Sequence, residues 1–513
     1  MTTPGDPLPL TRGRLFGIVA GVSLVVFLNA LRNSFALDDV SIIATNPWVH
    51  RWPELWQAFG QPYWPPWLGA AMYRPLPIVS YVLDWHTSSV MWMHAVNLLW
   101  HAGVSVAVAA LLLRLTESER AALLGGVLFA VHPLHVEAVA NIVGRAELMA
   151  AAFTVLAVYA ALAHDRLWWS LGALTLGLLS KETAATAPVL VAWGWIVGIG
   201  RPERRRMIAY VAGWGVVAVL YTGIRWTILH PYARIEHLAP VFSGASPLSV
   251  RLTTIAALTD IARLLVFPAT LRVDYSPAER TLVTTLLDGR FLAGVLCFLG
   301  WVALLWLAWR RGRKAEAFGL GWIAIAFLPV ANLFFPTGVL VAERTLYLPS
   351  VGLALAVGAW LWRLPSRWYW LILGCLTLLG GWRTWNRNPV WMNSRTVALS
   401  VLEDSPNSFS GPARMIGIYL AQHEPVKALA AFRKADSIFD KVPPTFLQGA
   451  DAAFAIGQPR LADSLLARME QLCYRCLYYY RYEAATAAAR GDSAVADSLL
   501  ERARRLGGST DNR

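Results

Sequence analysis

Two adjacent carboxylates, Asp38 and Asp39, follow directly after the first long apolar segment, in the stretch FALDDVSII. One of them could cap a short helix beginning at Val40, because a carboxylate there accepts backbone N–H bonds. A general base explains the pair better, since desolvation and a like-charged neighbour both raise the pKa of a carboxyl. The pair is therefore the first candidate for proton transfer.

Four cations lie in other short polar segments between apolar runs. Arg74 precedes a proline and so sits in a turn or extended stretch, where it could bind phosphate or snorkel. Arg145 follows Gly144, whose lack of a side chain allows close approach of an anion. Lys181 lies in the string SKE, which a plain turn also explains. Arg344 carries a permanent charge suited to holding a phosphate.

Further polar groups accompany these cations. The connector HPLHVEAVANIVGRAEL contains His132, His135 and Glu137, but it lacks the HEXXH spacing of a metal site. Glu343 and Tyr347 are four residues apart and would share a helix face beside Arg344. Three polar residues of MHAVNLLWHA lie on one face of the expected helix. We expect them to make helix–helix hydrogen bonds rather than to bind a metal ion. No metal ligand set is predicted.

The composition shows what must position these groups. The chain has 513 residues, of which 56% are hydrophobic and only 15% charged, and its mean hydropathy is +0.46. Its apolar residues form long blocks such as MIAYVAGWGVVAVLYTG, which match the thickness of a bilayer core. The sequence therefore predicts an all-α, polytopic membrane protein. The first block is too long for a signal peptide and is expected to remain as a span. The net charge of +13 is assigned to cytoplasmic loops, not to nucleic-acid binding.

The basic clusters RPERRR, RRGRK and RLPSR are placed in the cytoplasm together with the N-terminus. About eleven spans follow: 15–33, 92–114, 121–140, 146–163, 167–180, 184–200, 207–228, 291–310, 317–335, 349–363 and 368–383. Segment 251–270 is expected to be a re-entrant or interfacial helix. The polar segments then fall on the outer face: 34–91, 132–147, around 181, 229–290 and 336–348.

The last part of the chain, 384–513, is rich in Ala, polar and helical in period. Its apolar stripes repeat about every 34 residues, which favours a tetratricopeptide-type solenoid of about three units over a generic helical bundle. Cys473 and Cys476 could form a disulfide in an oxidising compartment, although a helix at this position would strain the bond.

One base candidate and four cations on one membrane face are what transfer from a lipid-linked phosphate needs. A sugar on a polyprenyl phosphate presents its anomeric carbon at the interface. A carboxylate can take the proton of an attacking hydroxyl there, while cations stabilise the departing phosphate.

The order of motifs resembles that of the transmembrane and tetratricopeptide-repeat O-mannosyltransferases, members of the GT-C glycosyltransferase superfamily. The strings are LDD, YRPL, MHAVNLLWH, HPLHVEAVANIVGRAELMA, SKE and ERTLYLPS, together with the junction RTWNRNPVWMNSRTVALSVLEDSPNS. The resemblance implies a GT-C catalytic domain at 1–383, with outer loops 34–91 and 229–290, and a helical repeat domain at 384–513. The tail is shorter than in the animal members, which suggests a bacterial homologue.

The resemblance also implies roles. Asp38 matches the acidic residue of the first outer loop and is expected to be the base, with Asp39 as its partner. The expected ligands of the donor phosphate are Arg74, Arg145, Lys181 and Arg344, with Arg145 and Arg344 foremost. The expected lining of the sugar or acceptor pocket is His132, His135, Glu137, Glu343 and Tyr347.

The expected function is thus an inverting transfer of a sugar, expected to be mannose, from a polyprenyl-phosphate donor to Ser or Thr hydroxyls of proteins. The alternatives are a glycan or lipid acceptor and, less favoured, a transporter or scaffold, which should show internal repeats and midplane charges. The expected location is a bacterial inner membrane, with the N-terminus cytoplasmic and the C-terminal domain periplasmic. The repeats would bind the acceptor polypeptide or dock another envelope protein.

Overall fold

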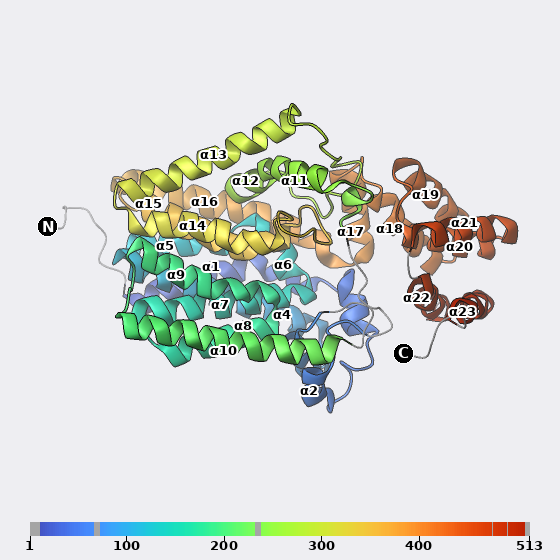
Figure 1. The fold of residues 1–513 in the computed structure, drawn as a ribbon, viewed down its shortest axis with the longest axis horizontal. Coiled ribbons are helices and arrows are strands. Elements are labelled where there is room, and N and C mark those ends of the chain that lie inside the picture. Colours follow the sequence, from blue (N-terminus) through green and yellow to red (C-terminus); the bar gives the residue numbers. More distant parts are fainter. Residues whose placement is uncertain (1–10, 66–71, 231–237, 474–475, 490, 508–513) are drawn as a thin grey trace.

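The structure is a computed structural model that describes residues 11–65, 72–230, 238–473, 476–489 and 491–507. Across these ranges the regular elements are all helices, and no strand occurs. The predicted all-α fold is therefore confirmed. Figure 1 shows a bundle of long, roughly aligned helices and a smaller group of helices beyond one end of it.

Each predicted span corresponds to a helix. These helices are α1 (Arg12–Phe27), α4 (Val90–Thr116), α5 (Glu119–Ala130), α7 (Arg145–His164), α8 (Leu167–Ser180), α9 (Ala187–Val197), α10 (Arg204–Leu229), α13 (Gly289–Arg310), α14 (Lys314–Phe327), α15 (Tyr347–Leu361) and α16 (Ser366–Arg387). Among the described residues, six helices are long and apolar enough to cross a membrane, or seven if one bent pair counts as a span. The protein is a multi-pass membrane protein, while the count of eleven crossings stays a prediction.

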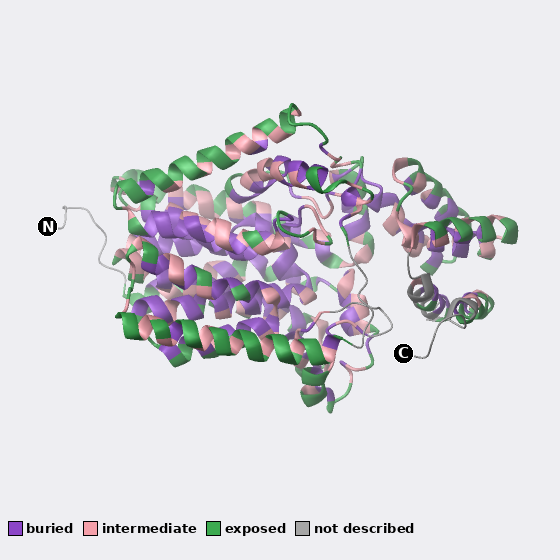
Figure 2. Cartoon of the chain, viewed as in Figure 1, coloured by how far each residue is buried: buried purple, intermediate pink, exposed green. Residues whose placement is uncertain are grey.

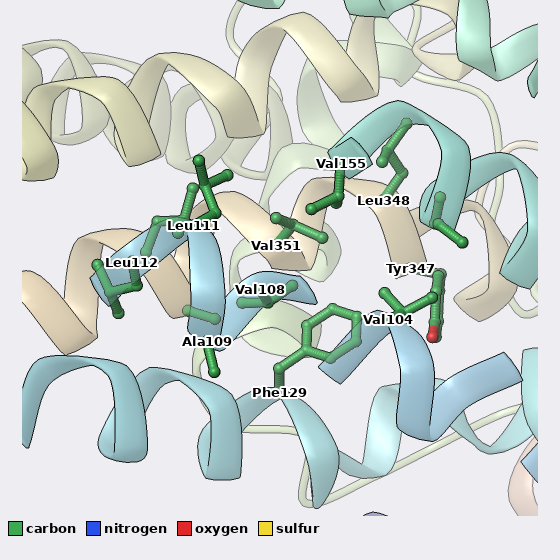
Figure 3. Close-up of a cluster of buried hydrophobic side chains, with 14 of the residues drawn as sticks. Val104, Val108, Ala109, Leu111, Leu112, Phe129, Val155, Tyr347, Leu348 and Val351 are labelled. Carbon is green, nitrogen blue, oxygen red and sulfur yellow. The ribbon is translucent and has the colours of Figure 1, made fainter. Parts of the chain in front are cut away.

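The bundle core is built from α4, α5, α7 and α15. Buried apolar side chains from these helices, such as Val104, Phe129 and Val351, interlock at its centre (Figure 3). Small residues allow close approach: a Cβ on Gly352 of α15 would lie 2.4 Å from the carbonyl oxygen of Gly319 in α14. In contrast, α10 and α13 are mostly exposed (Figure 2), as expected for helices that face lipid.

The basic connectors gather at the bundle end opposite the C-terminal helices. Lys314 Nζ donates to the carbonyl oxygen of Gly198 (3.0 Å), and Arg120 donates to that of Leu364 (3.2 Å). This agrees with one shared side for these loops, and the assignment of that side to the cytoplasm stays a prediction. The segment expected to be re-entrant forms two short helices, α11 (Pro247–Ala256) and α12 (Leu258–Val266), packed against α13.

The chain beyond α16 is helical throughout its described residues. After η11 (Asn388–Met392) and α17 (Ser394–Asp404) come three helical pairs: α18 (Ser410–Ala421) with α19 (Pro425–Ile438), α20 (Pro443–Ala455) with α21 (Pro459–Leu472), and α22 (Cys476–Ala489) with α23 (Ser493–Gly507). Their first helices begin at 410, 443 and 476, so successive pairs start 33 residues apart. This is close to the predicted period, while the tetratricopeptide assignment stays a prediction. Cys473 is disulfide-bonded, but the side chain of Cys476 lies outside the described residues.

Short elements carry the polar segments at the same end as the C-terminal pairs. They are η1 (Leu28–Arg32), the π-helix η2 (Val40–Ala44), α2 (Glu54–Gln57), α3 (Pro75–Trp85), η5 (Pro133–His135), α6 (Val136–Ala140), η6 (Ile142–Gly144), η7 (Glu182–Thr186) and η10 (Glu343–Leu346). In Figure 1, α2, α6 and α17 all lie toward this end. The bundle thus brings the predicted polar segments to one face.

Candidate functional site

Asp38 lies in the loop between η1 and η2. Leu37 before it adopts a φ of 51° and donates its N–H to Ser394 Oγ (3.0 Å), so the first outer loop is tied to α17. Asp38 is partly exposed, and no group in the described ranges donates a hydrogen bond to its carboxylate. It nevertheless lies close enough to Arg344 and Glu137 to interact with them electrostatically. A partly exposed carboxylate that accepts no hydrogen bond from a described residue can accept a proton from a substrate, and the nearby Arg344 can bind an anion.

Asp39 has a different environment although it is adjacent. Its fully buried carboxylate accepts backbone N–H bonds from Val143 (2.8 Å), Ala36 (3.1 Å) and Ile142 (3.4 Å). Burial raises its pKa to about 7 against the effect of these bonds, and Asp38 raises it further. The carboxylate therefore caps η6 rather than the helix at Val40. Asp39 holds the loop that carries Asp38, which makes it a positioning residue.

The raised pKa of Asp39 predicts how stability depends on pH. The folded state holds the Asp39 proton more tightly than the unfolded state, in which the pKa is near 3.8. The contribution of this proton to the free energy of unfolding is therefore complete below pH 3.8 and is lost as the pH rises through about 7. Asp39→Asn should therefore flatten the decline of unfolding temperature between about pH 4 and pH 7, measured on the detergent-solubilised chain. An unchanged slope in the variant would contradict this assignment.

Arg344, at the start of the η10–α15 segment, is held by Glu137 of α6. Its backbone N–H donates to Glu137 Oε2 (2.8 Å) and its Nη1 donates to Oε1 (3.1 Å). The side chain is 33% exposed, and its Nε and Nη2 donate to no residue in the described part of the chain. Glu137 thus orients the guanidinium, and two of its nitrogens stay available for a phosphate oxygen.

Lys181 and Arg74 complete a cationic group. Lys181 forms an ion pair with Glu147 of α7, and Arg74 donates from Nε (3.1 Å) and Nη2 (2.9 Å) to Glu182 of η7. Burial lowers the pKa of Lys181, Glu147 raises it, and the positive charges of Arg74 and Arg344 lower it further. The three cations are therefore close to one another. We call Arg74, Lys181 and Arg344 the cation cluster. Asp38 lies beside it.

Arg145 does not belong to this cluster, and its predicted contact with the donor phosphate stays a prediction. Its side chain is completely buried at the start of α7. Nε donates to Asn97 Oδ1 (2.8 Å), Nη1 donates to Ser80 Oγ (3.0 Å), Nη2 donates to the carbonyl oxygen of Met93 (2.8 Å), and Asp84 forms an ion pair with it. A guanidinium enclosed by these partners has no free face for a substrate. Arg145 instead joins α3, α4 and α7.

His135 and Tyr347 are also enclosed by protein. His135 Nε2 lies 2.7 Å from Ser350 Oγ, and the Tyr347 hydroxyl lies 2.8 Å from His101 Nδ1. Both side chains are 0% exposed and their rings contact each other within the core. Their predicted place in a sugar or acceptor pocket stays a prediction. They pack the junction of α4, η5 and α15.

His132 and Glu343 hold outer segments in place. His132 Nε2 lies 3.0 Å from the carbonyl oxygen of Leu265 at the end of α12. Glu343 Oε1 accepts from the backbone N–H of Arg272 and from the Tyr275 hydroxyl. Both side chains are at least 95% buried. These two predicted pocket residues likewise have structural partners, which leaves Glu137 as the predicted pocket residue that borders the cation cluster.

The structure also shows site residues that the motif analysis did not select. Glu147 and Glu182 each pair with a cation of the cluster, and the ring of Tyr63 lies under Arg74 with 5.3 Å between the ring centroid and Cζ. The signal for the two acids was present in the strings GRAEL and SKE, where each acid shares a polar segment with a cation. Tyr63 lies in a loop with no such signal.

Among the described residues, no group of three or more His, Cys, Asp or Glu side chains could hold a metal ion. Glu137, Glu147 and Glu182 are each paired with a cation of the cluster. The chemistry that this arrangement can perform is proton removal by Asp38 next to a site for a phosphate-type anion.

The fold and site define a multi-pass membrane protein with a charged site at one bundle end and helical pairs beyond it. Among curated proteins, the chain is 29% identical to the human protein O-mannosyl-transferase TMTC3 over 444 residues, covering 76% of this chain and 48% of that protein. It is 30% identical to human protein O-mannosyl-transferase TMTC4 over 68% of this chain and 55% of that protein. It is 29% identical to protein O-mannosyl-transferase F38B6.6 of Caenorhabditis elegans, over 69% of this chain and 52% of that protein.

The chain is therefore related to the transmembrane and tetratricopeptide-repeat O-mannosyltransferases, and the predicted resemblance is confirmed. It spans about half the length of the curated relatives that it matches. No family model matches the sequence, and no solved structure matches it.

Proposed function

We propose that this protein is an inverting glycosyltransferase that moves a sugar, mannose by analogy with its relatives, from a polyprenyl-phosphate donor to Ser or Thr hydroxyls of proteins. The observation that carries the proposal is the position of Asp38, which is partly exposed, has no hydrogen-bond donor among the described residues and interacts electrostatically with Arg344. The relatives named protein O-mannosyl-transferases support the reaction class and the protein acceptor.

The proposed reaction is a single displacement. The acceptor oxygen attacks the anomeric carbon on the face opposite the phosphate, and its proton passes to Asp38. The bond between the anomeric carbon and the phosphate oxygen breaks, and its electron pair leaves with polyprenyl phosphate. Arg344 then stabilises the negative charge that develops on the leaving oxygen, with Lys181 and Arg74 adding to the positive field.

The ion pairs prepare this site before the donor binds. Each cation of the cluster already has a carboxylate partner, namely Glu137, Glu147 or Glu182. These partners keep the cations oriented, so little reorganisation is needed when charge develops on the phosphate. The partial exposure of Arg344 makes it the cation most accessible to that phosphate.

The transfer reaction itself tests the proposal. The purified chain in lipid nanodiscs would receive polyprenyl-phosphate mannose with labelled mannose and a mixture of secreted proteins. We expect label in protein, released by alkaline β-elimination as expected for a Ser or Thr linkage. Label found only in lipid or free glycan would overturn the protein acceptor. No transfer with mannose or other polyprenyl-phosphate sugars would overturn the reaction class.

Arg344→Gln should lower kcat for this transfer by about 10²–10³-fold, because a preorganised donor to the developing charge is lost. Arg344→Lys should lose less, since it keeps the charge but not the planar fork. The matched control is Arg363→Gln, which removes an arginine paired with Glu316 at the opposite bundle end. Equal losses in Arg344→Gln and Arg363→Gln would show that the effect is not specific to the cluster.

A further inference from the structure

A cavity of about 100 Å³ lies where the outer segments of the bundle meet the first C-terminal helical pair. Glu137 and Arg344 border it on one side, and Arg414 of α18 borders it on another. Its remaining walls come from the segments 239–241, 273–276 and 338–342, together with Leu37 and Trp391. The cavity is therefore formed jointly by the bundle and the helical pairs.

The bundle side of the cavity adjoins the reacting groups. Leu37, the neighbour of Asp38, lines the cavity together with Glu137 and Arg344. Both of these charged residues interact electrostatically with Asp38. A group that enters the cavity thus comes close to the proposed base and to the cation that would hold the donor phosphate.

The other side is held in place by the segment before α18. The backbone N–H of Phe409 donates to the carbonyl oxygen of Pro277 (2.8 Å), and that of Ala278 donates to Asn407 (2.8 Å). Ser408 Oγ donates to Asp274 Oδ1 (2.9 Å). These bonds fix the start of α18 against the outer loop that follows α12.

Arg414 is consequently held at the cavity rim. Its Nε donates to Ser410 Oγ (3.1 Å), its Nη2 lies 4.0 Å from Asp274 Oδ2, and its side chain is 33% exposed. This arginine stands on the first helix of the helical pairs and borders the same cavity as Arg344. The same cavity is therefore bordered by residues of the proposed reaction site and by a residue of the first helical pair.

We propose that this cavity is the acceptor subsite: it admits the hydroxyl-bearing residue of a polypeptide, whose chain continues past Arg414 onto α18. This rests on the proposed transferase function. The volume fits a single amino-acid side chain and is too small for a lipid chain. Four charged side chains, Glu137, Asp274, Arg344 and Arg414, stand among apolar lining residues, which suits a side chain with both a hydroxyl and a methyl group. The helical pairs beyond the rim offer the extended surface that a polypeptide needs.

Photocrosslinking tests the subsite without requiring sugar transfer. A benzoylphenylalanine would replace Gly338, which lines the cavity and is exposed. The probe is a biotinylated synthetic peptide with a central Thr, competed by the same peptide without biotin. The matched control places the photoreactive residue at Arg311, an exposed position between α13 and α14 at the opposite bundle end. We expect competable crosslinking at position 338 and only background crosslinking at position 311.

The kinetics of a variant with a substitution in the cavity give an independent test. Gly338→Trp should partly fill the cavity and raise KM for the acceptor about tenfold while KM for the lipid donor stays unchanged. Equal crosslinking at positions 338 and 311, or a rise in donor KM alone, would overturn the subsite. If the wild-type chain transfers no sugar to protein, the proposed function fails, while the crosslinking result still decides whether a polypeptide binds here.

Discussion

Replacing Asp38 by Asn should lower kcat/KM for sugar transfer about 10²–10⁴-fold, the range expected when a general base is removed. Asn is similar in size but cannot accept the proton of the attacking hydroxyl. Because no described residue donates a hydrogen bond to the Asp38 carboxylate, the unfolding temperature should stay close to that of the wild type. The measurement is initial-rate transfer of labelled mannose together with thermal unfolding of the same preparation.

The matched control for Asp38→Asn is Asp165→Asn. Asp165 is exposed, pairs with Arg206, and lies between α7 and α8 at the end of the bundle away from the cluster. It should transfer sugar at the wild-type rate. Wild-type turnover by Asp38→Asn would exclude Asp38 as the base, and a large fall in its unfolding temperature would give it a structural role instead.

Arg145→Met should destabilise the folded chain by about 3–5 kcal/mol, the cost expected when one partner of a buried ion pair is removed. Asp84 would keep its charge but lose this cation, and Asn97 and Ser80 would lose their hydrogen-bond donor. The measurement is the free energy of unfolding, or the yield of folded protein where unfolding is irreversible. The chain should express poorly or unfold at a markedly lower temperature.

A second variant keeps this prediction testable if Arg145→Met fails to fold. Combining it with Asp84→Leu removes the orphaned charge, so much of the lost stability should return, since apolar replacement of a buried pair is often close to neutral. If Arg145→Met instead folds with normal stability and loses only donor binding, the arginine contacts the substrate and its structural role is contradicted.

Much of the architecture could be predicted from the sequence because apolar blocks of span length leave few other folds. The predicted spans correspond to helices from α1 to α16, and the polar segments do meet at one end of the bundle. The period of the tail predicted helical pairs, which the structure shows starting 33 residues apart. The number of true crossings could not be predicted equally well, because several helices such as α8 and α9 are short.

The site was harder to predict because a motif does not show which way a side chain faces. Arg145 and Arg344 both follow the pattern of a cation at a helix start, yet one is enclosed and the other is a third exposed. The same holds for Asp38 and Asp39, which are neighbours in sequence but contact different groups. Tertiary packing decides these cases, and the packing partners come from segments far away in the chain.

The strings SKE and GRAEL show acids close to cations in the sequence, but they do not show which acid pairs with which cation. In SKE, Glu182 does not pair with its neighbour Lys181 but with Arg74, which lies more than a hundred residues earlier. Such exchanged partners depend on how α7, α8 and η7 are placed in the bundle. Local spacing therefore predicts which residues are polar at this face and leaves the identity of their partners undetermined.

The most direct test of the central claim is a double-mutant cycle of transfer rates with Asp38→Asn and Arg344→Gln. If both side chains act on one transition state, their losses should be strongly non-additive, so that the double variant is about as slow as the slower single variant. Full multiplication of the two losses, or wild-type rates in either single variant, would contradict a single reaction centre formed by Asp38 and the cation cluster.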